Sequence, residues 1–294
     1  SASDTTAYFT HTVGSSDTGT ATVSVTAPDT AGNAATTSST TTFTIDTTAP
    51  AGATALTFTS SGGTVVANSL NATNTAFSVG ATITAGEVGS AGGTAELLID
   101  GASFSPTITT AVSNTESSVT LASGTTTTAG LQSLFTAGSA RVLTVKLTDS
   151  AGNATTSSGS GNTVSVLSDY TAPTVSTVTT SASGSKTTGA SVAITVTLSE
   201  AVTTSASATL TLETGTTDRD ATCPAVTTST TLTCTYTVVS GDTASRLDYV
   251  ATTSLATSGT VRDAAGNSAT LTLPATGGSG LYTANIIVDT TAPS

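Results

Sequence analysis

Apolar and polar residues alternate along much of the chain with a period of two, which is the pattern of a β-strand with one buried face. The clearest example is VAITVTLSEAV at 192–202, whose apolar face consists of Val192, Ile194, Val196 and Leu198. The same alternation occurs in LTVKLTD at 143–149, TLTCTYTV at 231–238 and ATVSVTAPD at 21–29. No window carries a sustained helical stripe of apolar residues. The pattern therefore predicts an all-β protein.

Two short phrases recur at a spacing that is typical of whole domains. The first, Asp-x-Ala-Gly-Asn, begins 120 and then 114 residues apart, at Asp29, Asp149 and Asp263. The second, Asp-Thr-Thr-Ala-Pro or Asp-Tyr-Thr-Ala-Pro, ends 123 and then 120 residues apart, at Pro50, Pro173 and Pro293. Two unrelated phrases with nearly the same period indicate tandem repeats, each large enough to have its own core.

Domain boundaries are predicted at the Thr-Ala-Pro phrases, because proline fixes φ, removes a backbone donor and suits a short, stiff connection. The predicted domains are residues 1–49, 50–172 and 173–294, the last of which ends in a linker. Residues 1–49 contain only three strand-like runs, which align with the last part of the other two ranges. We therefore expect them to be the C-terminal part of a domain from a longer chain. The alternative is that another molecule supplies the remaining strands by strand addition.

Composition narrows the class of protein further. The 294 residues are rich in Thr, Ser, Ala, Val and Gly, and only 8% are charged and 4% aromatic. A sequence with this bias can be disordered, but the regular alternation argues against disorder for most of the chain. The net charge of −12 argues against nucleic acid as a partner and permits cation binding. No apolar run in this segment is long enough to span a membrane.

The sequence offers little support for catalysis. Its single His, His11, alternates within the strand-like run YFTHTV and is predicted to lie on the surface of a strand. A set of nucleophile, His and acid cannot be assembled around one His in a partial domain. The acidic residues are scattered, and no glycosidase pair can be inferred from them. We therefore expect that the protein is not an enzyme.

Three stretches of residues 173–294 resemble a known family. They are VTLSEAVTTSASATLTLETGTTDRDAT, TYTVVSGDTASRLDYVATTSLATSGTVRDAAGNSATLTLPA and NIIVDTTAP. Together they resemble the bacterial immunoglobulin-like (Big-type) tandem repeats of giant extracellular adhesins and surface proteins. The resemblance covers nearly all of residues 173–294 and the last strands of residues 1–49. Residues 50–172 share only the two phrases and a compatible strand pattern.

The resemblance implies tandem immunoglobulin-like β-sandwich domains in an extracellular protein of the cell surface. The role that it implies is structural, as part of a stalk, filament or surface layer. The partners would be neighbouring repeats of the same protein and further copies in a polymer. The alternative is an adhesin module that binds a carbohydrate or a host protein. Such modules usually display aromatic residues on loops, whereas the five Tyr and six Phe here mostly alternate within strands.

The repeated acidic phrases have two interpretations. Taken alone, Asp-x-Ala-Gly-Asn is a turn in which Asp accepts backbone hydrogen bonds, and Gly and Asn tolerate positive φ. That interpretation leaves the acidic residue before Thr-Ala-Pro unexplained. In a sandwich that the chain enters at one pole and leaves at the other, the turn before the last strand faces the entering linker. Each joint then gathers two or three carboxylates and an Asn carbonyl.

We expect calcium at these joints, and the resemblance also implies it, because calcium often stiffens the joints of such arrays. Clustered carboxylates repel each other unless a cation neutralises them, and calcium takes about 6–8 hard oxygen ligands. The predicted ligands at the first joint are Asp46, Glu87, Asp149 and Asn153. The predicted ligands at the second joint are Asp169, Glu200, Asp263 and Asn267.

Cys223 and Cys234 are the only cysteines, and they flank PAVTTSTTLT in two consecutive strand-like runs. A pair in such positions can bridge neighbouring antiparallel strands. The expected oxidising, extracellular setting favours this disulfide. Two free, buried thiols are the alternative.

Asn71 and Asn153 each begin an Asn-Ala-Thr tripeptide that fits a glycosylation sequon. Such tripeptides arise often by chance in a chain rich in Asn and Thr. Asn153 also belongs to the repeated loop, which gives it another explanation. We expect sugar at neither residue.

Overall fold

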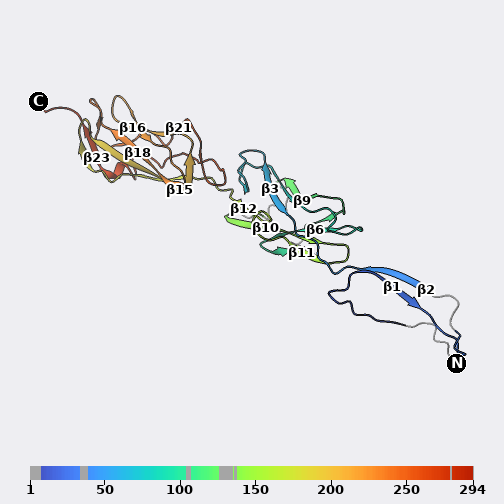
Figure 1. Ribbon diagram of the computed structural model, residues 1–294. Coiled ribbons are helices and arrows are strands. Elements are labelled where there is room, and N and C mark those ends of the chain that lie inside the picture. The colour runs from blue at the N-terminus through green and yellow to red at the C-terminus, as the bar shows by residue number, and fades with distance from the viewer. Residues whose placement is uncertain are drawn as a thin grey trace. The chain divides into compact units, whose positions relative to one another are not determined.

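The protein is built from β-strands throughout the part of the chain that the computed structural model describes. These residues are 8–33, 39–103, 107–125, 135, 138–278 and 280–293. They confirm the predicted all-β fold, and their one helical element is the 3-10 helix η2 (Tyr282–Ala284). β1 (Gly19–Val25) and β2 (Ser39–Ile45) form a two-stranded antiparallel sheet (Figure 1).

Residues 55–168 contribute two sheets. The three-stranded sheet has the order β3 (Ala55–Ser61), β5 (Ala76–Thr82), β9 (Ser118–Thr125). The main path of the seven-stranded sheet is β4 (Ser69–Leu70), β12 (Val164–Ser168), β10 (Ser139–Thr148), β6 (Gly93–Ile99), β7 (Ala102–Ser103). Two more strands pair with β10 and β6, and they are β11 (Ala154–Thr156) and β8 (Thr109–Val112).

Residues 175–289 contribute two further sheets. The main path of the eight-stranded sheet is β13 (Val175–Thr179), β15 (Ser191–Thr204), β18 (Ser229–Thr237), β17 (Arg219–Cys223), β16 (Ala208–Glu213), β20 (Asp248–Tyr249). Two more strands pair with β16 and β15, and they are β21 (Leu255–Thr257) and β22 (Val261–Arg262). The three-stranded sheet has the order β14 (Gly184–Lys186), β23 (Ile286–Asp289), β19 (Thr243–Ala244). Each sheet takes its strands from one of the ranges 1–49, 50–172 and 173–294, and the division into three domains stays a prediction.

The contacts of the chain group into two compact units. Unit 1 comprises Ser1–Thr59, Ser78–Gly124 and Arg141–Ser165, and unit 2 comprises Ser60–Phe77, Thr125–Ala140 and Val166–Ser294. Each unit contains a linker Asp together with the Asp-x-Ala-Gly-Asn loop that was predicted to face it. Asp46 and residues 149–153 belong to unit 1, and Asp169 and residues 263–267 belong to unit 2.

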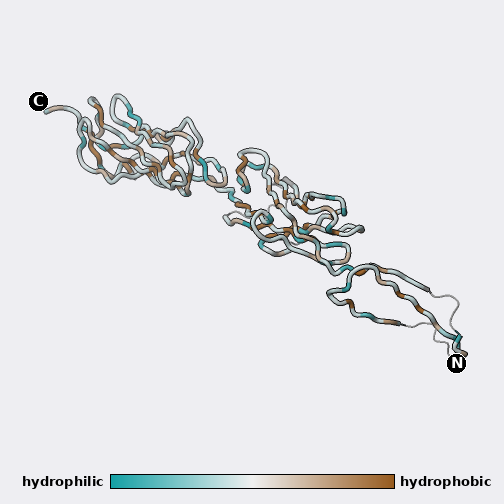
Figure 2. The backbone as a smooth tube through the Cα atoms, viewed as in Figure 1, coloured by the Kyte–Doolittle hydropathy of each residue, from teal (hydrophilic) through white to brown (hydrophobic). Residues whose placement is uncertain are grey.

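The core of unit 2 follows the predicted alternation. Val192, Ile194 and Val196 of β15 are fully buried. They pair across the antiparallel ladder with Tyr236, Cys234 and Leu232 of β18, which are buried as well. Figure 2 shows hydrophobic residues interspersed with more polar ones along the backbone of unit 2. Burying each of the large side chains contributes roughly 1.5–3 kcal/mol, so this pair of strands is central to the stability of the unit.

The structure contains the predicted disulfide between Cys223 and Cys234. Cys223 ends β17 and Cys234 lies in β18, two neighbouring antiparallel strands whose ladder pairs Thr222 with Thr235. Both sulfur-bearing residues are fully buried in the core of unit 2. The bond therefore closes a short loop inside one sheet.

The sheet of β1 and β2 presents an apolar face to solvent. Ala21 pairs with Phe43, and Val23 and Val25 lie on the same face because side chains alternate along a strand. Val23, Val25 and Phe43 are 44%, 43% and 49% exposed. None of the described residues from 8 to 49 is buried.

Candidate functional site

The loop at residues 263–267, called the Asp263 loop below, is held by hydrogen bonds to its first side chain. Asp263 Oδ1 accepts hydrogen bonds from the amides of Gly266 and Asn267, at 2.7 and 2.9 Å. Asp263 Oδ2 accepts one from Asn267 Nδ2 at 2.8 Å. Gly266 has φ of +97°, a conformation that favours glycine. The Asp, the Gly and the Asn of the phrase therefore each have a local structural role.

The other two copies of the phrase form a similar turn, in which Asp Oδ1 accepts from the Ala amide in place of the Gly amide. Asp149 Oδ1 accepts from the amides of Ala151 and Asn153, both at 2.9 Å, and Asp149 Oδ2 accepts from Asn153 Nδ2 at 3.0 Å. Asp29 receives the equivalent three bonds from Ala31 and Asn33 at 2.8–2.9 Å. The turn interpretation thus explains the interior of all three loops.

These bonds also affect the ionisation of two of the loop carboxylates, Asp149 and Asp29. Burial by itself would raise the pKa of Asp149, but the hydrogen bonds from the Asn153 side chain and three backbone amides outweigh burial and lower that pKa. The side-chain bond from Asn33 is the largest cause of a lowered pKa at Asp29. At Asp149 and Asp29 the turn therefore stabilises the charged form of the carboxylate.

The loops contact the linkers as the sequence predicted, but through an Asn donor. Asn153 Nδ2 donates to the backbone carbonyl of Asp46 at 3.0 Å. Asn267 Nδ2 donates to the backbone carbonyl of Asp169 at 2.9 Å. These Asn side chains were predicted to be carbonyl ligands, whereas in the structure their Nδ2 groups join loop and linker directly.

The linker Asp side chains have a local role that was not predicted from the sequence. Each accepts a hydrogen bond from the amide two residues later, which is an Asx turn. The three bonds are Thr48 N to Asp46 Oδ1 at 3.0 Å, Thr171 N to Asp169 Oδ1 at 2.9 Å and Thr291 N to Asp289 Oδ1 at 2.9 Å. The acidic residue before Thr-Ala-Pro therefore has an explanation that needs no metal.

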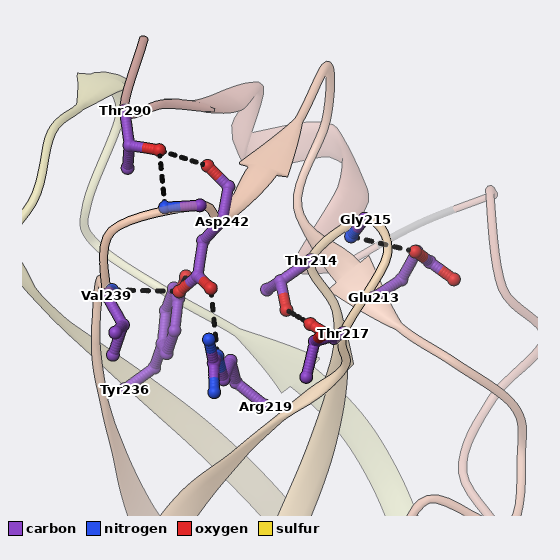
Figure 3. Close-up of polar contacts among 10 residues, drawn as sticks. Glu213, Thr214, Gly215, Thr217, Arg219, Tyr236, Val239, Asp242 and Thr290 are labelled. Carbon is purple, nitrogen blue, oxygen red and sulfur yellow. Dashed lines mark hydrogen bonds and ion pairs between the residues drawn. The ribbon is translucent and has the colours of Figure 1, made fainter.

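In two of the three linkers, the Thr after the linker Asp binds a second loop. Thr290 Oγ1 donates to the carbonyl of Asp242 and accepts from the amide of Gly241, both at 3.0 Å (Figure 3). Thr47 Oγ1 lies 3.2 Å from the carbonyls of both Ser15 and Asp17. The loops that Thr47 and Thr290 bind, at residues 15–18 and 240–243, share the sequence Ser-x-Asp-Thr. This shared sequence is a feature from which the contact could have been predicted.

Asp242 is the centre of a buried polar network (Figure 3). Its Oδ2 accepts from the Tyr236 hydroxyl at 2.7 Å and the Val239 amide at 2.8 Å, and its Oδ1 accepts from Arg219 Nε at 2.8 Å. Burial would raise the pKa of Asp242, but these bonds, led by that of Arg219, lower it. Burial, followed by the bond to Asp242, raises the pKa of Tyr236. The network ties the end of β18 to the loop that Thr290 binds.

His11 occupies the position equivalent to Tyr236. It lies six residues before Asp17, as Tyr236 lies six residues before Asp242, and its Nε2 is 3.4 Å from Asp17 Oδ2. The amide three residues before each Asp, from Gly14 or Val239, donates to that same Oδ2. The side chain of His11 is 75% exposed, as predicted, but the strand predicted over YFTHTV is wrong, because residues 8–13 form no strand and β1 begins only at Gly19. The Asp partner of His11 supports a structural role.

Three predicted ligands of the second joint come together. One carboxylate oxygen from each of Asp169, Glu200 and Asp263 lies within 4.8 Å of the others, and all three residues are half-buried. Burial is the largest cause of a raised pKa at Glu200, followed by the charges of Asp169 and Asp263. Within the described residues this is the one group of three or more His, Cys, Asp or Glu side chains close enough to share a metal ion.

The predicted ligands of the first joint make a looser arrangement. Glu87 Oε2 accepts a hydrogen bond from the Ala51 amide at 2.7 Å, so Glu87 does contact the linker after Pro50. Asn153 contacts Asp46 through its amide, as described above. Asp46, Glu87 and Asp149 do not form a group of the kind seen at Glu200.

No protein-family model matches the chain, and a search of the curated proteins finds no significant match. Within the described part of the chain, no helix has the length and apolar character needed to cross a membrane. The described residues therefore form an all-β protein with repeated contacts between loops and linkers and with one cluster of three carboxylates.

Proposed function

We propose that this chain is a non-catalytic, structural repeat region of an extracellular protein, belonging to a stalk, filament or surface layer. The observation that carries the proposal is the repeated contact between an Asp-x-Ala-Gly-Asn loop and the linker before it. The same hydrogen bond, from Asn Nδ2 to the linker Asp carbonyl, occurs at Asn153 and at Asn267. The repetition of this contact within one chain is expected of a protein whose function depends on how successive domains connect.

We further propose that calcium binds the cluster of Asp169, Glu200 and Asp263. Three carboxylates within 4.8 Å of one another repel when all are ionised, and a divalent cation would remove that repulsion. Carboxylate oxygens are the ligands that calcium prefers, and a set of three leaves room for water among its roughly 6–8 ligands. Bound calcium would join the linker, the β15 strand and the Asp263 loop.

A calcium titration of the purified chain tests this proposal. We expect the melting temperature to rise with calcium, since a ligand at 100 times its Kd stabilises the folded state by about 2.7 kcal/mol. Glu200→Gln removes one charge of the cluster and should abolish the shift. Asp218→Asn is the matched control, because Asp218 is exposed and lies outside the cluster, and it should keep the shift. An equal response of both variants would refute the assigned site.

A further inference from the structure

A loop in residues 64–74, called the Asn71 loop below, is organised by buried amide side chains. Asn71 and Asn74 are 1% and 4% exposed, although both are polar. Asn71 Nδ2 donates to the Thr64 carbonyl at 2.7 Å, and Asn74 Nδ2 donates to the same carbonyl at 2.9 Å. Asn74 Oδ1 accepts a hydrogen bond from the backbone amide of Asn71 at 2.9 Å. Asn71 Oδ1 accepts one from the backbone amide of Thr73, also at 2.9 Å. Hydrogen bonds within residues 64–74 therefore stabilise the loop, apart from any contact with another loop.

One amide hydrogen of Asn71 is directed at the Asp263 loop. An Asn amide group has two donors, and the second donates to the Ala265 carbonyl at 2.8 Å. In the reverse direction, the Ala72 amide donates to Asn267 Oδ1 at 2.9 Å. Ala265 and Asn267 are themselves 1% and 2% exposed. Both loops belong to unit 2, so these bonds lie within one compact unit.

The Asn71 loop also packs closely against position 266, so that any side chain there would require a neighbour to shift. A Cβ placed on Gly266 would lie 2.8 Å from Val66 Cγ2 and 3.1 Å from Asn71 Nδ2. The equivalent Gly152 has a similar φ of +95°, but a Cβ there would meet nothing within 4 Å. The two glycines thus share the same backbone requirement and differ in the contact.

We propose that the Asn71 loop is a recognition surface for the Asp-x-Ala-Gly-Asn loop, and that it holds the Asp263 loop without a metal ion. The Asn71 loop contacts three groups from the defined positions of the phrase. They are the Ala carbonyl, the Gly, which has no side chain, and the side-chain oxygen of the Asn. All the groups that form this contact are neutral. The contact therefore needs no cation and should not depend on ionic strength. The preformed loop lowers the entropy cost of docking. This contact is independent of the calcium proposal.

Hydrogen exchange of the full chain, measured by mass spectrometry in chelator, tests the proposal. In the wild-type chain, peptides covering residues 64–74 should be protected in chelator as well as in calcium. Gly266→Ala should raise their exchange about tenfold, since losing a buried hydrogen bond exposes both partners. Gly152→Ala carries the same backbone strain and should leave residues 64–74 unchanged. Adding Val66→Ala to Gly266→Ala removes the nearest clashing atom and should restore part of the protection.

A second variant approaches the contact from the other side. Asn71→Asp keeps the oxygen that accepts from Thr73 but loses both Nδ2 hydrogen bonds, the one to Ala265 and the one to Thr64 within the Asn71 loop. It should raise the exchange of residues 263–267 while peptides of the β15 core keep wild-type protection. The proposal is wrong if wild-type residues 64–74 lose protection in chelator. It is also wrong if Gly266→Ala and Gly152→Ala affect residues 64–74 equally. A missing calcium response would refute only the metal site.

Discussion

At the scale of single residues, the linker Asp combines a side-chain role with a backbone role. The carboxylate of Asp169 accepts the Thr171 amide, and the carbonyl of the same residue accepts the Asn267 amide group. Asn267 in turn bonds Asp263. A chain of hydrogen bonds therefore connects the linker to the loop, which explains why the two phrases recur together.

Asp242 gives a prediction at this scale. Replacing it with Asn removes a charge from a carboxylate that Arg219, Tyr236 and Val239 all contact. Since hydrogen bonds to a charged group contribute about 1.5–3 kcal/mol, we expect the free energy of unfolding near pH 7 to fall by about that much. Urea unfolding of the two chains measures the difference. An unchanged midpoint would show that the network contributes nothing.

The pH dependence of that difference follows from the lowered pKa of Asp242. A carboxyl whose pKa is lower in the folded state stabilises the protein fully above its unfolded pKa of about 3.9. That contribution is lost as the pH falls through the folded pKa. The gap between wild type and Asp242→Asn should therefore be constant above pH about 5 and shrink in more acidic solution. A gap that widens on acidification would contradict the assignment.

At the scale of elements, the alternating segments were predictable and the irregular ones were not. β15 and β18 follow the period of two because one face of each is buried. β4 and β19 have two residues each, too few for a period to appear. The parallel pairing of Leu167 with Ser69 joins residues that no local pattern connects. The Asn71 loop was hidden for a related reason, because polar Asn and Thr residues usually signal an exposed turn.

The disulfide gives a prediction at the scale of the sheet. Cys223 and Cys234 are 11 residues apart, so the chain-entropy estimate gives a stabilisation of about 2–3 kcal/mol. Reduction of the unfolded chain followed by refolding should lower the free energy of unfolding by that amount. Thiol labelling of the unfolded, unreduced chain gives an independent check, with no reactive thiol expected. Two labelled thiols per chain would contradict the bond.

At the scale of the whole molecule, the two units differ in how they hold the linker. Unit 1 has the bonds from Asn153 to Asp46 and from Ala51 to Glu87. Unit 2 has the equivalent Asn267 bond, the acidic cluster around Glu200 and the contact with the Asn71 loop. The sequence predicted equal joints because the phrases repeat. The difference arises from residues outside the phrases, of which Glu87 and Glu200 were predicted from the sequence and the Asn71 loop was not.

The central claim is that these loop-to-linker contacts fix the connection between successive domains and that calcium strengthens them. Small-angle X-ray scattering of the 294-residue chain, in calcium and in chelator, tests it most directly. We expect a longer maximum dimension and a narrower distribution of shapes with calcium. Asp169→Ala and Asp263→Ala should each remove the difference, because they take ligands from the linker and from the loop. Identical scattering in calcium and chelator would contradict the claim and leave the acidic phrases with turn and linker roles only.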